Sequence, residues 1–107
     1  MELNQYQIVL VNLDPTIGSE IQKTRPCVII SPNEMNQFLR TVTIAPMTTS
    51  SRNYPSRVKV KHNGQEGWIV LDQIRTIDKT RIVKIFGMIT AKEIKACKNV
   101  IREIFVD

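Results

Sequence analysis

Apolar residues in this chain fall in short runs separated by turn-forming residues, a pattern typical of a β-rich protein. The segment Tyr6–Leu13 contains four consecutive aliphatic residues, and Arg25–Ser31 contains three. Runs of this kind, without polar residues between the apolar ones, indicate strands that are buried on both faces. We predict further strands at Arg40–Pro46, Ser56–His62, Trp68–Leu71, Gln73–Ile77 and Arg81–Gly87.

Strict alternation distinguishes Ser56–His62 from the other predicted strands. Its basic residues, Arg57, Lys59 and Lys61, share one face, and the two valines between them share the other. This pattern predicts a half-buried strand whose outer face is basic. The dipeptide Asn63-Gly64 follows directly and is a strong signal for a tight hairpin turn.

The end of the chain changes from a strand pattern to a helical one. Thr90 and Glu93 have the spacing of a capping box, with Thr90 as the N-cap residue. Between the strands we expect a short helical turn at Glu34–Leu39 and a polar loop at Met47–Pro55. We predict one amphipathic C-terminal helix that packs its apolar face on the sheet. That face consists of Ile94, Cys97, Ile101, Ile104 and Phe105.

Many short strands and one terminal helix favour a mainly β fold, a small antiparallel barrel rather than a βαβ arrangement. The 107 residues are enough for a single domain, 1–107, and 42% hydrophobic with 23% charged residues is an ordinary globular composition. No apolar run approaches the roughly 20 residues of a membrane span. The first residues show neither the basic nor the apolar part of a signal peptide, so we expect a cytoplasmic protein without membrane association.

The net charge of +5 is unevenly distributed. Residues 35–65 contain no acidic residue and include five basic ones: Arg40, Arg52, Arg57, Lys59 and Lys61. A basic block of this kind suits a polyanion, above all nucleic acid. The alternative is a solvated surface that is basic by chance. Charge alone does not separate DNA from RNA, or either from an acidic protein.

The sequence offers little for metal binding. Cys27 lies in an apolar predicted strand and Cys97 on the apolar face of the predicted helix, so we interpret both as buried small hydrophobes in a reducing compartment. His62 is the single histidine, and at a strand end it is more typical of a surface residue than of a general base. Without a Cys/His cluster a zinc site is not expected. The sequence therefore predicts neither a metal nor another cofactor.

The most informative segment is the turn Asp14–Glu20, followed by Arg25-Pro26 at the start of the second predicted strand. It places an acid, a hydroxyl and a guanidinium at one end of the sheet. An arginine fork matches a phosphodiester, and a carboxylate can act as a base toward a ribose 2′-hydroxyl. With a hydroxyl from Thr48–Ser51, these groups would suffice for metal-free RNA cleavage. Taken singly, each is more typical of an ordinary turn or surface.

Several motifs together resemble the MazF/PemK family of ribosome-independent endoribonuclease toxins. They are Val9–Glu20, Lys23–Pro32, Pro46–Ser50 with Tyr54-Pro55, and Leu71–Asp78, which occur in order over nearly the whole chain. The resemblance implies an SH3-like barrel of the CcdB/PemK type, a homodimer, and cleavage of single-stranded RNA at a short sequence. It also implies neutralisation by an antitoxin whose tail occupies the RNA groove, and we expect that antitoxin to be acidic.

The resemblance also assigns roles to individual residues. Arg25 matches the family's arginine of the Arg-Pro motif, Thr48 its catalytic threonine, and Glu20 the acid of its Gly-x-Glu turn. In the PemK branch a histidine follows the turn glycine, and a further arginine lies two positions before the Asp-Gln pair. This chain has Ser19 and Val70 at those two positions. The resemblance therefore implies the Arg25/Thr48 mechanism. It implies an RNA path along Gly18, Ser19, Lys23, Thr49, Arg52, Asp72 and Gln73.

Two other functions are compatible with such a barrel. One is a toxin that poisons gyrase by binding it without chemistry, which would not need the Arg25/Thr48 pair. The other is a barrel that binds nucleic acid without cleaving it. Incubation with long single-stranded RNA in EDTA separates these readings, because only an endoribonuclease would give discrete fragments. The loops 17–24 and 49–55 are where the RNA sequence preference would be set.

Overall fold

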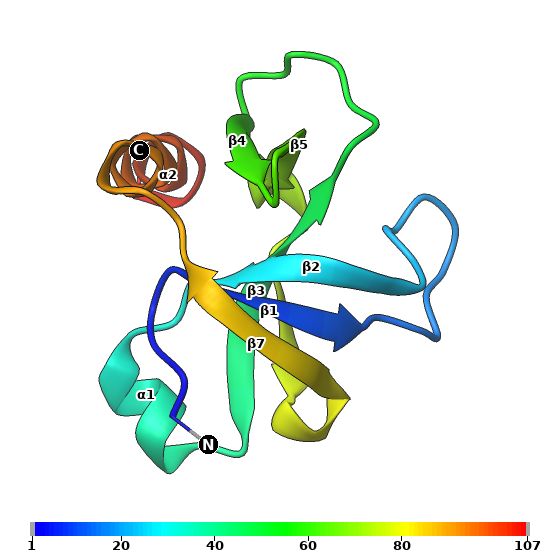
Figure 1. The fold of residues 1–107 in the computed structure, drawn as a ribbon, viewed down its shortest axis with the longest axis vertical. Helices are drawn as coiled ribbons and strands as arrows, with labels where there is room; N and C mark the ends of the chain where they lie inside the picture. Colours follow the sequence, from blue (N-terminus) through cyan, green and yellow to red (C-terminus); the bar gives the residue numbers. More distant parts are fainter. Residues whose placement is uncertain (1, 107) are drawn as a thin grey trace.

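Seven antiparallel strands form one strongly curled sheet in the computed structural model, which describes residues 2–106 (Figure 1). The order β4-β5-β3-β2-β1-β7 runs along the sheet, and β6 pairs with β3 beside β5. The predicted mainly β, antiparallel fold is confirmed. The strands are β1 (Gln7–Asn12), β2 (Thr24–Ile29), β3 (Thr41–Thr48), β4 (Arg57–His62), β5 (Gln65–Val70), β6 (Arg75–Asp78) and β7 (Ile82–Met88).

Helical segments lie at the ends and corners of this sheet. The short helix α1 (Asn33–Phe38) connects β2 to β3, and single 3₁₀ turns, η1 (Leu71–Gln73) and η2 (Lys79–Arg81), flank β6. The C-terminal helix α2 (Ala91–Ile101) packs against β4 and continues into a π-helical turn, η3 (Arg102–Val106). Figure 1 shows α1 and α2 at opposite ends of the curled sheet.

The sheet is buried on both faces in its middle, as the continuous apolar runs predict. Successive residues of one strand enter different clusters: Cys27 packs with Val9 and Ile44, whereas Val28 packs with Ile69 and the helix α2. This division follows from the alternation of side chains along a strand. Because two apolar clusters form, a chain of this length buries a substantial core.

Both cysteines are fully buried, as predicted, Cys27 in one cluster and Cys97 in the other. Burial raises the pKa of each thiol to about 12. At neutral pH both are therefore protonated and behave as small apolar side chains.

The predicted start of the C-terminal helix is confirmed, and the predicted end of its apolar face is wrong. The Thr90 hydroxyl accepts a hydrogen bond from the Glu93 backbone, and the Glu93 carboxylate accepts one from Thr90. Ile104 and Phe105, however, are exposed rather than packed on the sheet. The change to a π-helical turn at Arg102 rotates these last residues away from the direction that helical spacing predicts.

Three predicted boundaries also shift. β3 continues through Thr48, although Met47 and Thr48 were expected in a loop, because these residues pair with Ile69 and Trp68 of β5. The strand β5 begins at Gln65, three residues earlier than predicted. Gln73 lies in the turn η1 rather than in a strand. In the first two cases cross-strand pairing, which a local pattern does not show, decides the outcome.

The hairpin between β4 and β5 forms at Asn63-Gly64 as predicted. Both residues have positive φ angles, 52° and 76°, as a two-residue type I′ turn requires. This turn sets the register in which His62 faces Gln65 and Lys59 faces Trp68.

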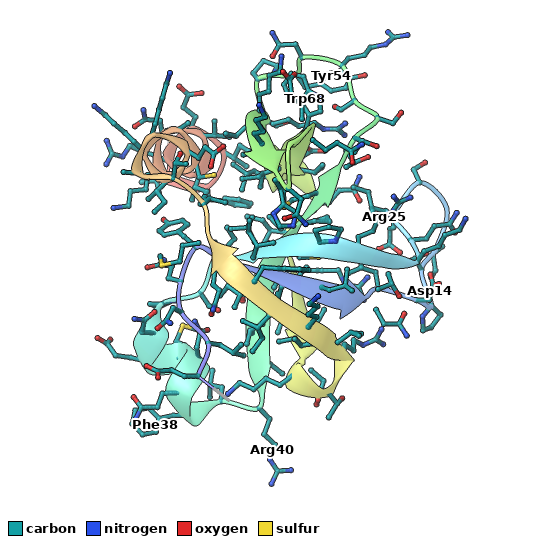
Figure 2. All side chains as sticks on the ribbon, viewed as in Figure 1. Asp14, Arg25, Phe38, Arg40, Tyr54 and Trp68 are labelled. Carbon is teal, nitrogen blue, oxygen red and sulfur yellow. The ribbon has the colours of Figure 1, made fainter. Side chains whose placement is uncertain are left out.

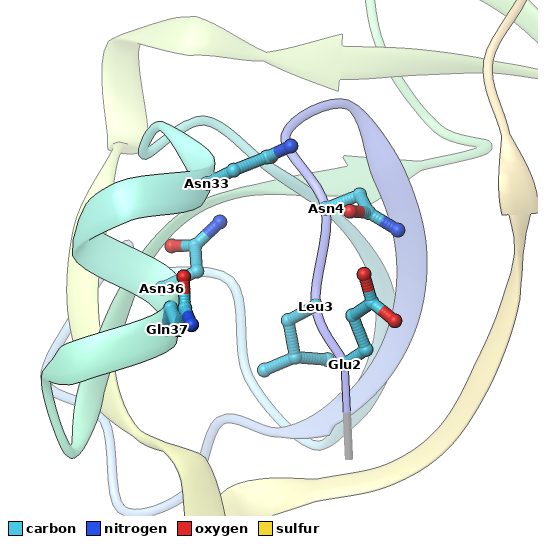
Figure 3. Close-up of a pocket in the computed structure, with 6 residues that line it drawn as sticks. All are labelled: Glu2, Leu3, Asn4, Asn33, Asn36 and Gln37. Carbon is cyan, nitrogen blue, oxygen red and sulfur yellow. The ribbon is translucent and has the colours of Figure 1, made fainter.

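A polar hollow of about 460 Å³ lies beside α1, far from the motifs discussed above (Figure 3). Two of its asparagines already have partners within the protein. Asn33 Oδ1 accepts from the Gln5 backbone at 2.8 Å, and the buried Asn36 amide donates to the Ser31 carbonyl at 2.9 Å. The first bond attaches α1 to the chain that precedes β1, and the second ties α1 to the end of the β2–α1 connection. The hollow is lined by Glu2, Leu3, Asn4, Asn33, Asn36 and Gln37.

Candidate functional site

Arg25 and Thr48 lie on neighbouring strands and border the same hollow. The β2–β3 ladder runs as far as the pair Cys27–Pro46, and Arg25 and Thr48 lie just beyond it, each two residues from this last pair. Both side chains are half-buried. The sequence places these two residues 23 positions apart, and the sheet brings them to one edge of the site.

The Arg25 guanidinium is anchored at one end. Its Nε donates to the Gln22 carbonyl at 3.3 Å, and its side chain lines the hollow. Within residues 2–106 the ion pairs are Arg57–Asp72 and Lys59–Glu66, so no carboxylate described there neutralises Arg25. A positive, half-buried fork without an acidic partner is suited to bind a phosphate.

The Thr48 hydroxyl sits at the end of β3, where the chain leaves the sheet. Its Oγ1 accepts a hydrogen bond from the Ser50 backbone at 3.2 Å and lies 3.4 Å from the Ser50 carbonyl. This local turn fixes the hydroxyl beside Arg25. The next residue, Thr49, is exposed and also lines the hollow.

The opposite wall of this hollow comes from the β4–β5 hairpin, which sequence reasoning did not place at the site. His62, Gln65, Glu66 and Gly67 line it. His62 is half-buried rather than on the open surface, with its ring edge-on to Phe86 at 5.0 Å between centroids. The Asn-Gly turn was the available signal, because it returns β5 beside β4 in a fixed register.

Gly67 permits the close approach of β5 to the end of β3. A Cβ atom at this position would lie 3.1 Å from the Thr48 carbonyl oxygen, closer than most side-chain contacts. The glycine is buried and lies next to the Thr48–Trp68 pair. Any larger residue would press directly on the backbone that carries the Thr48 hydroxyl.

Glu20 lies elsewhere in the β1–β2 loop. Its Oε1 accepts from the Ile17 backbone at 2.6 Å, which closes the turn around Gly18. It lines a second hollow together with Asp72, Gln73 and Arg75. The structure therefore does not bring Glu20 into the hollow that Arg25 and Thr48 share.

The β1–β2 loop presents its small residues outward. Gly18 adopts a positive φ of 60°, and both Gly18 and Ser19 are exposed. Lys23, also exposed and at positive φ, donates its backbone N–H to Asp14 Oδ1 at 2.9 Å. This bond closes the base of the loop and leaves the Lys23 side chain free to face a ligand.

Asp72 and Gln73 hold loops in place. Asp72 accepts from Arg57 Nε at 3.2 Å and from the Ser56 hydroxyl at 2.9 Å. Burial would raise the pKa of Asp72, but these hydrogen bonds outweigh it and hold the pKa below its usual value. Gln73 Oε1 accepts from the Ile21 backbone at 2.9 Å, which attaches the β1–β2 loop to η1.

The predicted basic face of β4 forms, but two of its three charges are paired. Arg57 binds Asp72, and Lys59 Nζ lies 3.0 Å from Glu66 Oε2. The acids come from β5 and η1, beyond the acid-free stretch of the sequence. Arg52 is exposed in the loop that follows β3, so it adds an unburied charge near this face.

Comparison with known proteins identifies the family. A family model described as PemK-like, MazF-like toxin of type II toxin-antitoxin system matches residues 4–105. The chain is a member of this family. The resemblance inferred from the motifs is confirmed.

Relatives of the PemK/MazF family match over most of their length. The Endoribonuclease MazF of Staphylococcus saprophyticus is 31% identical over 100 residues, which cover 88% of this chain and 83% of that protein. The crystal structure of MazF from Deinococcus radiodurans has a TM-score of 0.88 at 20% identity and covers 100% of this chain and 99% of its own. This likeness confirms the fold of the family member described here.

A further solved structure of the same fold is an endoribonuclease in complex with its cognate antitoxin from a mycobacterial species. Its TM-score is 0.80 at 20% identity, and the match covers 94% of this chain and 92% of that one.

This PemK/MazF family member shows neither a metal-binding cluster nor a membrane-spanning helix among residues 2–106. Among residues 2–106, no three His, Cys, Asp or Glu side chains lie close enough together to hold a metal ion. None of the helices in that range is long and apolar enough to cross a membrane.

Proposed function

We propose that this chain is a sequence-specific, metal-independent endoribonuclease toxin that cleaves single-stranded RNA and is neutralised by a cognate antitoxin. The observation that carries the proposal is the hollow shared by Arg25 and Thr48, in a member of a toxin family with relatives named endoribonucleases. An unpaired guanidinium beside a fixed hydroxyl is the arrangement that a phosphodiester needs.

In this proposal Arg25 and Thr48 act on the scissile phosphate. Charge builds on its non-bridging oxygens as the phosphorus becomes pentacoordinate, and donors fixed in advance stabilise that charge. Arg25 supplies the positive charge and Thr48 a hydroxyl donor. The exposed residues Lys23, Thr49 and Arg52 would contact the RNA on either side of this point. Gly18, Ser19, Asp72 and Gln73 stay in the proposed RNA path.

The nucleophile is the 2′-hydroxyl of the ribose next to the scissile phosphate. Its oxygen bonds to phosphorus and its proton passes to a base. The bond to the 5′-oxygen breaks, and that oxygen takes up a proton. The immediate products are a 2′,3′-cyclic phosphate and a 5′-hydroxyl, and addition of one water molecule to the cyclic phosphate, with cleavage of its bond to the 2′-oxygen, gives the 3′-phosphate.

Glu20 is our proposed base: it is exposed, and it would have to release the Ile17 backbone N–H that it now accepts in order to reach bound RNA. His62 is a second candidate, because it already lines the hollow of Arg25 and Thr48.

The partners we propose are RNA, an acidic antitoxin and a second copy of the chain. Lys61 and the exposed Lys59 and Arg52 would attract acidic side chains. The edge strand β7 supports the homodimer, because it exposes Val83, Ile85 and Met88 at an unpaired edge. We place the protein in the cytoplasm, where messenger RNA is available.

The decisive experiment is incubation with long single-stranded RNA in EDTA. We expect discrete fragments with 5′-hydroxyl ends, and sequencing of those ends gives the recognised sequence. An oligonucleotide with one 2′-deoxy residue just 5′ of a mapped cut should bind and remain intact. Cutting of that oligonucleotide at a comparable rate would require water as the nucleophile and would overturn the proposed mechanism. Binding without fragments would favour a non-catalytic barrel.

A further inference from the structure

Thr48, which borders the hollow at Arg25, is also the first member of a row of side chains that crosses three strands. Thr48 of β3 is the direct cross-strand partner of Trp68 in β5, and Trp68 is the direct partner of Lys59 in β4. Directly paired residues of an antiparallel sheet project from the same face. The row therefore reads Thr48, Trp68, Lys59 across β3, β5 and β4, and Arg25 adjoins it through the hollow that it shares with Thr48.

Trp68 is the only tryptophan of the chain and remains partly exposed. A tryptophan on a sheet surface more often has the structural role of covering the sheet. The partial burial of Trp68 fits that structural role too. Its cover on the β4 side is loose, since Lys59 Nζ lies 5.9 Å from the ring centroid. The Lys59 side chain is itself 60% exposed. The Lys59 ammonium is also paired with Glu66, but this ion pair is exposed on both sides and contributes little, so Lys59 can leave both the ring and Glu66 for a phosphate.

The spacing of this row matches a nucleotide. Adjacent strands lie about 4.8 Å apart, so Trp68 is one strand from Thr48, and Lys59 is about 10 Å, or two strands, from Thr48. A phosphate held at Arg25 and Thr48 would place an adjoining base above the indole. A second phosphate would then lie within reach of the Lys59 ammonium.

We propose that Trp68 is a base-stacking platform for the nucleotide next to the scissile phosphate, with Lys59 binding the following phosphate. Single-stranded RNA is commonly held by stacking of unpaired bases on aromatic rings, in grooves that carry positive charge. The inference rests on the proposed function, because it adds a base subsite to the phosphate site of Arg25 and Thr48.

The single tryptophan gives a direct readout of this subsite. The probe is a single-stranded RNA oligonucleotide that spans a mapped cut and carries one 2′-deoxy residue just 5′ of it. Fluorescence anisotropy of a dye on this RNA reports binding, and the intrinsic emission of Trp68 reports contact at the ring. We expect the emission to be quenched over the same RNA concentrations at which anisotropy rises. RNA binding with unchanged tryptophan emission would overturn the inference.

Two substitutions separate stacking from a structural role. Trp68→Leu keeps a large apolar side chain without an aromatic face, and Trp68→Phe keeps a smaller aromatic face. We expect RNA affinity to fall about 10-fold in Trp68→Leu, within a range of roughly 5- to 150-fold, and much less in Trp68→Phe. Circular dichroism shows whether each variant is folded. If Trp68→Leu is unfolded, the fluorescence experiment on the unaltered protein decides alone.

A matched control removes an aromatic ring far from the row. Phe38 of α1 is 78% exposed at the far end of the molecule, so Phe38→Leu should leave RNA affinity unchanged (Figure 2). A folded Trp68→Leu variant that binds RNA as tightly as this control would refute the base subsite.

Failure of the base subsite and failure of the proposed function give different results. Wild-type protein that neither binds nor cuts RNA would defeat the proposed function. Wild-type protein that cuts normally while Trp68 gives no response would defeat only the subsite. Quenching by an acidic peptide without any by RNA would assign the ring to a protein partner and would also refute the subsite.

Discussion

Arg57 and Asp72, 15 residues apart, form the ion pair that joins β4 to the turn η1. The guanidinium reaches both carboxylate oxygens, at 3.2 and 3.3 Å, and lies 4.8 Å from the centre of the Tyr54 ring. One aspartate thus organises the strand, the turn and the loop that precedes β4. The stability of the fold should therefore depend on the negative charge of Asp72.

Replacement of Asp72 by asparagine should destabilise the protein in a pH-dependent way. The pKa of Asp72 is lower in the folded state than in the unfolded chain, so its contribution is full above the ordinary carboxyl range and disappears as pH falls through the folded value. We expect Asp72→Asn to cost roughly 1 kcal/mol at pH 7, the upper end for a partly exposed pair. Urea unfolding should show this difference shrinking as the pH approaches 3. A difference that grows on acidification would contradict the assignment.

Replacement of Arg25 by alanine should remove cleavage without unfolding the protein. Loss of one donor to a developing anion typically lowers the rate by about 100- to 1000-fold. RNA cleavage and circular dichroism would be measured on the same preparation. Arg40→Ala is the matched control, because Arg40 is an exposed arginine at the other end of the molecule (Figure 2). A folded Arg25→Ala variant with activity close to that control would remove Arg25 from the site.

Alanine at position 67 should impair activity more than stability. Its methyl group would lie 3.1 Å from the Thr48 carbonyl oxygen and would displace the end of β3 by a few tenths of an ångström. A shift of this size misplaces the Thr48 hydroxyl relative to the phosphate, and catalysis is sensitive to such displacement. We expect kcat to fall about 10-fold or more while the thermal midpoint changes little. Alanine at Gly87, where an added Cβ meets open space, is the control.

Glutamine variants of Glu20 and His62 should identify the group that accepts the 2′-hydroxyl proton. General base catalysis typically contributes about 100- to 10,000-fold, so loss of the true base should lower kcat by that order with little change in KM. We expect this loss in Glu20→Gln and a loss below about 10-fold in His62→Gln. The reverse result would transfer the role to His62, which the structure places nearer to Arg25.

The two thiols should be silent toward alkylating or disulfide reagents in the folded protein. Burial raises the pKa of Cys27 and Cys97 to about 12, so the reactive thiolate is scarce and shielded at pH 8. Both should react within minutes after unfolding in guanidinium chloride, and mass spectrometry would count the modified thiols. Rapid labelling of the native protein at either position would contradict the burial described here.

The sequence predicted what depends on local pattern. Continuous apolar runs correctly indicated strands buried on both faces, and Asn63-Gly64 correctly indicated the hairpin. The same pattern did not show that Met47 and Thr48 continue β3, because their partners in β5 lie about 20 residues away. Non-local pairing overrides the local preference of such residues.

Local sequence pattern was also insufficient to predict the whole candidate site. Motifs found Arg25 and Thr48, which the sheet brings to one hollow. They did not find His62 or Gly67, because a hairpin from another part of the chain supplies that wall. The acid-free stretch 35–65 also predicted a more positive surface than the fold presents. Glu66 and Asp72 neutralise Lys59 and Arg57 from strands and turns that fold back across it.

The β1–β2 loop is fastened by groups that belong to a distant part of the chain. Gln73 holds the Ile21 backbone, Arg75 Nη1 donates to the Leu13 carbonyl at 3.2 Å, and Arg81 donates to the Asp14 carbonyl at 2.6 Å. Only the tip around Gly18 is left without such ties. Residues at that tip can therefore be exchanged during evolution without moving Arg25. If the proposed function holds, a chain built in this way could acquire a new RNA target through a few surface substitutions and keep the site at Arg25 and Thr48 intact.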